Sequence, residues 1–573
     1  MDSKQTKIVL GLLALVLLAW IFSPLLFSFR EQGLPISRTP LSFDEAESYR
    51  LVQDFVTQYP TRVLGSLESR QSTGYIHEHL EEQGYSISYS HFDARIAGHR
   101  QVGRNVLAYK QGKTQEMIAL VAHLDTARTT VQGAMDNGSG VGVLLELARI
   151  FAAGPTQRSL LVIFSDGEEW GMLGARDLAG SYPERFRLAA VLSLDHVGVG
   201  DLEAFCLEET GQLKGFTPPW LRQLARQAAE SQGLRVIGPS GFSEYLERAF
   251  LISWADQGPF LSAGVPSINL GSESKEATRE REIYHSAGDT IEKLKPASVG
   301  AYGRAAERIV RTLDEMPVIP VESSEPFRVW DALFLRAHAI SALQLLLFLP
   351  TALVLAAHVK NHRHRLRPIL VGREILAYVG TVLPFWAIYF SIALFRALRL
   401  IPLYTLYPAT IKDPVLETLP WGVLSGIAGT ALFVAAACYI LAKFSFADLP
   451  RPSFYVSKIV LLALLVTGVG FSLCYNSYWA SLFFVFPAWI WALADPQFQG
   501  RATSRILIVA AAIPYFGLAW VCSSRLDLGW DFAWYQVLAL STGLFTKAAY
   551  FLATGIIAIG IRFLVIQSHE NLS

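Results

Sequence analysis

The chain has 573 residues, of which 52% are hydrophobic and only 17% are charged, and its formal net charge is zero. This length exceeds that of a usual single domain, and the composition indicates a soluble domain joined to membrane segments. The balanced charge, without a long basic run interleaved with aromatic residues, excludes nucleic acid as an expected partner.

Residues 8–29 form an apolar run without any charge, which is long enough for a helix that spans a membrane. Lys4 and Lys7 precede this run, and Arg30 follows it. A cleaved signal peptide normally has a shorter apolar region that ends at small residues, whereas residues 20–29 are bulky. We therefore expect residues 1–30 to form an uncleaved transmembrane anchor.

Residues 41–316 alternate apolar stretches with amphipathic ones, which predicts an α/β domain with a mostly parallel, twisted sheet flanked by helices. Apolar and β-branched residues predict strands at 85–92, 105–109, 117–122, 160–165, 189–194 and 267–270. Apolar residues that recur at three- and four-residue intervals predict helices at 140–153, 219–232 and 296–315. The proline-containing segment 317–328 is expected to be a linker.

Residues 329–573 are expected to form an all-helical membrane domain of about seven transmembrane helices. The apolar stretches that predict these helices are 333–358, 374–395, 420–441, 456–475, 478–494, 506–522 and 541–561. Basic residues concentrate in the loop 360–373 and around two later loops, and loops of this kind usually stay in the cytoplasm. Residues 41–316 should then lie outside the cytoplasm. We expect a bacterial inner membrane, with an endoplasmic reticulum or vacuolar membrane and a luminal domain as the alternative.

Histidine and acidic residues follow several of the expected strands, where open α/β sheets assemble their sites. His123 and Asp125 end one strand, and a carboxylate two residues after a histidine suits a metal ligand with its orienting partner. Asp195 ends another apolar strand. Taken alone, a histidine at a strand end is more often hydrogen-bonded to a neighbouring acid than bound to a metal.

Further acidic residues lie in loops. Asp136 lies in a glycine-rich turn before an apolar helix, where it could serve only as a helix cap. Glu168 and Glu169 follow a strand that should be buried, and such neighbours repel each other unless a cation or a proton separates their roles; a solvated loop is the alternative. Tyr284 and His285 form the last such segment. The combination of these segments, in this order, predicts a catalytic metal site better than any one of them does.

The order His-x-Asp, Asp-Asn-x-Ser-Gly, Glu-Glu, Asp and Tyr-His resembles that of the co-catalytic di-zinc aminopeptidases of peptidase family M28. Residues 255–260, Ala-Asp-Gln-Gly-Pro-Phe, also resemble the family's segment before the last histidine. This chain has Gln257 where the family commonly has a histidine, which puts a contact near the specificity pocket in doubt. The resemblance covers residues 42–316 and implies a zinc aminopeptidase-like fold.

Carried onto this sequence, the resemblance implies two zinc ions per chain. His123 and Asp195 would hold one ion, Glu169 and His285 would hold the second, and Asp136 would bridge both. Zinc accepts histidine nitrogen and carboxylate oxygen, and a catalytic site keeps a position open for water.

The resemblance also implies the catalytic roles of three other residues. Glu168 would be the general base, Asp125 would orient His123, and Tyr284 would help to stabilise the oxyanion. The expected protein is a metallo-exopeptidase in the lipid bilayer that removes N-terminal residues from extracytoplasmic peptides.

Two alternatives remain open from the sequence. The same fold could use a single zinc ion for glutaminyl cyclisation, although the paired glutamates and two aspartates favour a two-metal hydrolase. The chain could also be a peptide-binding receptor or transporter in which the helical half does the main work. Such a binding module would not need the complete set of ligands.

Overall fold

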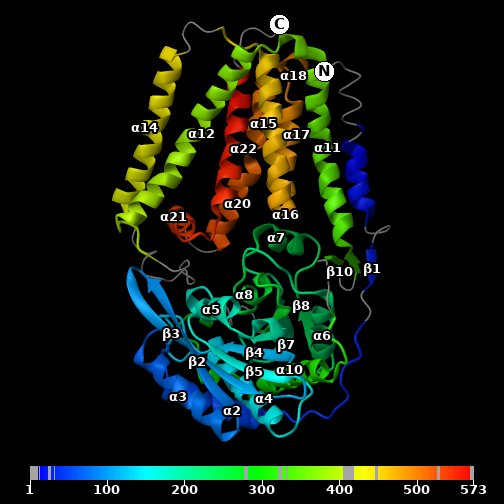
Figure 1. Ribbon diagram of the computed structural model, residues 1–573, viewed down its shortest axis with the longest axis vertical. Helices are drawn as coiled ribbons and strands as arrows, with labels where there is room; N and C mark the ends of the chain where they lie inside the picture. Colours follow the sequence, from blue (N-terminus) through cyan, green and yellow to red (C-terminus); the bar gives the residue numbers. More distant parts are fainter. Residues whose placement is uncertain are drawn as a thin grey trace. The chain divides into compact units, whose positions relative to one another are not determined.

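The computed structural model describes residues 11, 13–23, 28–30, 33–275, 282–320, 326–330, 333–403, 419–445, 450–525 and 529–567 (Figure 1). The chain divides into two compact units. The sheet unit contains Phe29–Phe334, and the helix unit contains Met1–Ser28, Leu335–Leu403 and Pro414–Ser573. The sheet unit thus extends on both sides of the expected domain 41–316.

The sheet unit is built on an eight-stranded sheet with the order β2-β3-β5-β4-β6-β9-β7-β8. Its strands are β2 (Ser86–Ile96), β3 (His99–Lys110), β4 (Met117–His123), β5 (Ser159–Ser165), β6 (Leu188–Leu194), β7 (Leu202–Glu208), β8 (Arg235–Ile237) and β9 (Ser267–Ser274). The four central strands β5, β4, β6 and β9 are parallel, as expected. Antiparallel pairs of β2 with β3, β3 with β5, and β7 with β9 make the whole sheet mixed.

Helices cover both faces of this sheet. They are α2 (Glu45–Gln58), α3 (Leu67–Glu82), α4 (Ser139–Ala152), α5 (Leu173–Ser181), α6 (Pro219–Glu230), α7 (Phe242–Phe250), α8 (Gln257–Ser262) and α10 (Pro296–Glu315). The larger core packs α2, α4, α6 and α10 on one face, and a smaller core packs α5 and α8 on the other. Since parallel strands with both faces covered are apolar throughout, every residue of β4 and β5 is buried.

A small three-stranded sheet pairs the segments on either side of this fold. Its order is β1 (Ser28–Arg30), β11 (Leu333–Leu335) and β10 (Phe327–Trp330). The expected linker 317–328 therefore ends in a strand. Buried hydrogen bonds hold β10 to α7: the Arg328 amide donates to Glu244 Oε1 at 3.0 Å, and the Arg248 guanidinium donates to the Pro326 carbonyl at 2.9 Å.

Among its described residues, the helix unit contains six helical segments that are long and apolar enough to cross a membrane: Ala337–Arg365, Pro368–Ala397, Trp421–Ser445, Phe454–Tyr475, Arg501–Trp520 and Lys547–Ile566. Leu13–Ser23 and Ser477–Leu493 are shorter apolar helices. All seven C-terminal stretches expected from the sequence contain helix. The expected first span is described only in part, because residues 1–10, 12 and 24–27, with Lys4 and Lys7, lie outside the described residues.

These segments correspond to the helices α11 (Ala337–His362), α12 (Pro368–Ala397), α14 (Trp421–Ser445), α15 (Phe454–Tyr475), α16 (Ser477–Ala480), α17 (Phe486–Leu493), α18 (Pro496–Gln499), α19 (Arg501–Ala510), α20 (Ile513–Arg525), α21 (Phe532–Thr542) and α22 (Lys547–Ile566). Two ion pairs lie buried between them: Lys458 with Asp495 at 3.3 Å, and Arg562 with Glu374 at 2.8 Å.

Candidate functional site

Three neighbouring parallel strands bring the first histidine and three of the acids to one edge of the sheet. His123 is the last residue of β4, Asp195 directly follows β6, and Glu168 and Glu169 begin a short helical turn after β5. Gly167 precedes this turn with a φ of 76°. Glycine adopts that left-handed conformation without a steric cost, so the chain can turn sharply after the buried strand.

Two loops supply the remaining residues. Asp136 lies in the irregular turn Ala134–Gly138 before α4, and His285 lies in the segment between β9 and α10. The carboxylate of Asp289 accepts the backbone N–H groups of Met135 at 2.7 Å and of Asp136 at 3.1 Å. Asp289 therefore ties the two loops together and fixes the position of Asp136.

The predicted ligands form two groups that share Asp136. In one group, His123 Nε2 lies 3.1 Å from Asp136 Oδ1 and 3.2 Å from Asp195 Oδ1. In the other, His285 Nε2 lies 3.1 Å from Asp136 Oδ2 and 2.9 Å from Glu169 Oε2. Each oxygen of the Asp136 carboxylate thus faces a different histidine.

Asp125 contacts two residues of these groups, His123 and Glu169, and also contacts Glu168. Its carboxylate accepts the backbone N–H groups of Glu168 at 3.0 Å and of Glu169 at 3.3 Å. Its Oδ1 atom also lies 3.5 Å from Nδ1 of His123, whose Nε2 atom faces the first group. Asp125 is placed to fix both the histidine ring and the glutamate turn.

The remaining two predicted residues lie near the opening of the site. Glu168 is 9% exposed, and burial raises the pKa of its carboxyl group well above the usual range. Tyr284 is 43% exposed, and its ring stacks on that of His285 with 3.8 Å between the centroids. The ring of His196, which no sequence argument identified, meets Tyr284 edge-on at 5.5 Å.

The charges of the site fit metal cations. Burial alone would lower the pKa of His123, but the surrounding carboxylates, Asp195 first, raise it well above its usual range. Burial also lowers the pKa of His285, but the negative charge of Glu169 outweighs this effect. The pKa of His285 therefore rises to about 10. Burial raises the pKa of Glu169 itself to about 7. Buried acids in excess over two imidazoles need cations, and nitrogen with carboxylate oxygen is a donor set that zinc accepts.

Several residues that support this site were not expected from the sequence. The buried Arg62 donates to the carbonyl oxygens of Leu124, at 2.7 Å, and of Gly133, at 3.0 Å, and so braces the loops after β4 and before Asp136. Asp256, in the segment that resembles the family, accepts a short hydrogen bond from Ser165. An arginine that is buried for its backbone contacts has no recognisable pattern in a single sequence.

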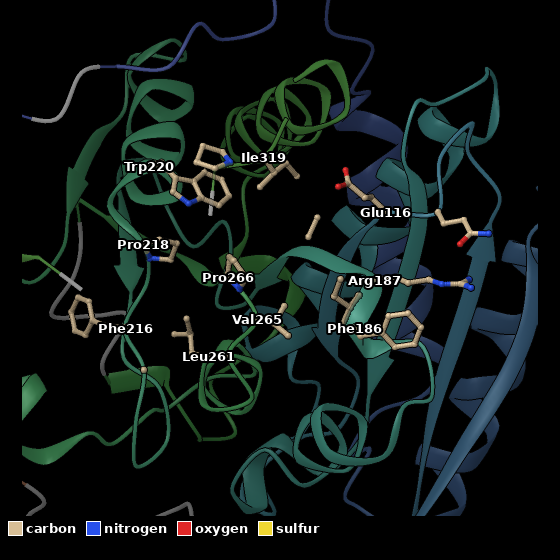
Figure 2. Close-up of a pocket in the computed structure, with 16 residues that line it drawn as sticks. Glu116, Phe186, Arg187, Phe216, Pro218, Trp220, Leu261, Val265, Pro266 and Ile319 are labelled. Carbon is tan, nitrogen blue, oxygen red and sulfur yellow. The ribbon is translucent and has the colours of Figure 1, made fainter. Parts of the chain in front are cut away.

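A cavity of about 660 Å³ lies elsewhere in the sheet unit, near the amino-terminal ends of β4, β6 and β9. Figure 2 shows Trp220, Pro218 and Pro266 on one side of it and Phe186 and Arg187 on the other. Its described lining includes none of the histidines and acids above. It is therefore separate from the candidate site, which lies at the opposite ends of the same strands.

The α/β sheet carries two histidine–carboxylate groups around a shared aspartate, an arrangement that suits metal ions. Residues 105–310, which lie within the sheet unit, match the model of peptidase family M28.

Three relatives illustrate the similarity. The chain is 32% identical to the alkaline phosphatase isozyme conversion protein of Escherichia coli, over 30% of this chain and 55% of that protein. It is 24% identical to a vacuolar membrane protease of Candida glabrata, over 48% of this chain and 28% of that protein. It is 27% identical to aminopeptidase YwaD of Bacillus subtilis, over 34% of this chain and 41% of that protein. The chain thus spans about half or less of these relatives.

Two solved structures are similar to the sheet unit. A glutaminyl cyclase from Porphyromonas gingivalis has 22% identity and a TM-score of 0.40, over 47% of this chain and 98% of that chain. The zinc aminopeptidase BSAP from Bacillus subtilis has 16% identity and a TM-score of 0.40, over 47% of this chain and 95% of that chain.

Proposed function

We propose that the protein is a membrane-bound zinc aminopeptidase that removes N-terminal residues from extracytoplasmic peptides and holds two zinc ions per chain. The position of Asp136 carries this proposal, because its two oxygens face His123 and His285 separately at 3.1 Å. A single-metal site would not need a carboxylate shared in this way. The relative named as an aminopeptidase supports the exopeptidase activity.

Zinc bound in this site would supply a Lewis acid and would lower the pKa of a water molecule towards neutrality. His123, Asp195, Glu169 and His285 would hold the ions, with Asp136 between them. Glu168 would accept a proton from the attacking water and pass it to the leaving amine.

The basic loops support one side of the membrane for the sheet unit. Lys360, Arg363 and Arg365 lie at the end of α11 and just beyond it, and Arg367 directly precedes α12. If this loop stays in the cytoplasm, α11 leads back to the cytoplasm from the sheet unit. We infer that the sheet unit lies outside the cytoplasm, in a bacterial inner membrane, and that it acts there on peptides.

The test is the metal content of the full-length protein measured together with its turnover. We expect about two zinc ions per chain and hydrolysis of peptides with a free N-terminus but not of their N-acetylated forms. A chain that binds one ion and cyclises N-terminal glutamine without hydrolysis would be a glutaminyl cyclase. A chain that binds peptides without turnover, although fully metallated, would be a binding module.

A further inference from the structure

A second group of polar residues lies beside the candidate site, on the face of the sheet that α5 and α8 cover. Side chains alternate between the faces of a strand, and the apolar neighbours of Asn269 and Glu208 point to the opposite face. Asn269 of β9 pairs in register with Glu208 of β7 and, on its other side, with Ser193 of β6. Since neighbouring strands lie about 4.8 Å apart, Glu208 lies two strands, or about 10 Å, from the strand that ends at Asp195.

The start of α8 brings two more polar residues to this row. Asp256 and Gln257 are at most 1% exposed, and the Gln257 side-chain amide donates to the carbonyl oxygen of Thr210, two residues after Glu208, at 3.4 Å. Hydrogen bonding from Gln257 and from the Trp254 backbone opposes the rise in the pKa of Glu208. We call Glu208, Asn269 and Gln257, with Asp256 next to Gln257 in the chain, the acceptor cluster.

The acceptor cluster has more acceptors than donors. Among the described residues, Oδ1 of Asp256, Oε1 of Gln257 and Oδ1 of Asn269 are buried and have no hydrogen-bond donor. Native structures leave few such atoms unpaired, because an unpaired buried acceptor costs about 1–3 kcal/mol. These three oxygens, together with the Glu208 carboxylate, point to a ligand that is rich in N–H donors.

The charge of the cluster is also unbalanced. Burial, together with the negative charges of Asp195 and Glu247, raises the pKa of Glu208 to about 8. Burial likewise raises the pKa of Asp256 to about 7. The acids Asp195 and Glu247 act on Glu208, whereas Arg222 and Arg248 act on Glu247.

We propose that the acceptor cluster receives the side chain of the first substrate residue and selects a basic one, lysine or arginine. This proposal rests on the proposed aminopeptidase function. The cluster adjoins Asp195, one of the residues beside which the scissile bond would lie, so a long side chain can extend from there towards Glu208. Lysine and arginine carry several N–H donors, no acceptor and one positive charge, which match the unpaired oxygens and the excess of acid.

A comparison of lysine with norleucine tests this in the unaltered protein. The two side chains are equally long and differ in the terminal ammonium group. With zinc-loaded full-length protein, kcat/KM for lysyl and arginyl 4-nitroanilides should exceed that for the norleucyl compound by about 100-fold or more, because a buried acid without its cation is left uncompensated. Free arginine should also inhibit competitively at lower concentration than free norleucine.

Glu208→Gln separates a specificity role from a structural one. This substitution keeps the shape of the side chain and removes its charge, so the preference for lysine over norleucine should fall about 100-fold. Glu208→Asp should keep part of the preference. Glu203→Gln is the matched control, since Glu203 lies on the same strand but forms an exposed ion pair with Arg235 at 2.7 Å.

The outcomes distinguish the two proposals. Equal or better turnover of the norleucyl compound by the unaltered protein would overturn the basic preference and leave the aminopeptidase function intact. An unchanged lysine-to-norleucine ratio in a folded, zinc-loaded Glu208→Gln variant would overturn the specificity role of the acceptor cluster. Absence of turnover for every unblocked substrate at full zinc content would refute the proposed function itself.

Discussion

At the residue scale, Asp125 holds the turn that carries Glu168 and Glu169. Its carboxylate accepts the backbone N–H groups of both glutamates. The Glu169 side chain accepts the Ala127 N–H at 2.8 Å and also faces His285. The two adjacent glutamates can therefore have different roles, because the Glu169 carboxylate already contacts Ala127 and His285.

Glu168→Gln should leave the fold and the zinc content unchanged and lower kcat by about 10²- to 10⁴-fold, since only proton transfer is removed. Elemental analysis and steady-state kinetics on the best peptide substrate measure the two effects. Loss of zinc, or turnover close to that of the unaltered protein, would show that Glu168 is not the base.

Asp136→Ala should deplete zinc at both positions, because one carboxylate faces both histidines. The control is Asp201→Ala, which removes an exposed acid that pairs with Lys295 at 2.8 Å. Elemental analysis of both variants decides between the roles, and an unchanged stoichiometry in Asp136→Ala would refute the bridging role.

Asp166 should make the stability of the protein depend on pH. Burial, and then repulsion from Asp125, raises the pKa of Asp166 to about 8 from an ordinary value of 3.8. The folded state then binds more protons than the unfolded state between these values, so this group lowers stability as pH rises through that window.

The effect should approach about 1.4 kcal/mol per pH unit inside the window. Asp166→Asn removes the titration, so its melting temperature relative to that of the unaltered protein should rise from pH 5 to pH 8. Parallel melting curves at all pH values would contradict the raised pKa.

At the scale of elements, the contact between α2 and α4 depends on Gly142. A Cβ atom at this position would lie 2.3 Å from Val52 Cγ2 and 3.0 Å from the Ser48 carbonyl oxygen. Gly142→Ala should therefore lower the free energy of unfolding by about 1–3 kcal/mol.

Gly74→Ala provides the opposite case within the same unit. Gly74 lies inside α3, and a Cβ atom there would have no neighbour within 4 Å. Alanine should raise stability there by about 0.5–1 kcal/mol, because it restricts the unfolded chain. Thermal unfolding of the two variants in detergent should thus shift in opposite directions, and a shared direction would contradict the packing argument.

The elements that the sequence predicted well are those with a single dominant signal. β4 and β5 are continuous apolar runs, and α10 has a regular apolar stripe. β7 was missed because its apolar run, residues 204–207, is short and has a glutamate on either side. α7 was missed because the charged residues Glu244 and Arg248 are part of its buried face.

The residues of the candidate site also differ in how well the sequence predicts them. Its histidines and acids stand at strand ends in an order that can be recognised, and the structure brings them together. Asp289 and Arg62 act through backbone groups of distant loops, and the acceptor cluster forms only when β7, β9 and α8 meet. A local sequence pattern does not predict contacts of this kind.

At the scale of the whole molecule, the orientation in the membrane is the main expectation that remains to be tested. Ser231 follows α6 in the sheet unit, and Asn361 lies near the end of α11 beside the basic loop. In right-side-out vesicles, an impermeant thiol reagent should label a cysteine at position 231 but not one at 361. The reverse pattern would place the peptidase in the cytoplasm and overturn the proposed substrates.

The small sheet that pairs β1 with β11 has a consequence for the architecture of the gene product. The two ends of the sheet unit lie side by side, as the ends of a domain inserted into another protein's loop usually do. A short turn that joins residue 28 to residue 335 should therefore replace the entire sheet unit without changing the order of the remaining helices. The sheet unit is thus an inserted domain, which lies in the sequence between the first apolar helix and α11.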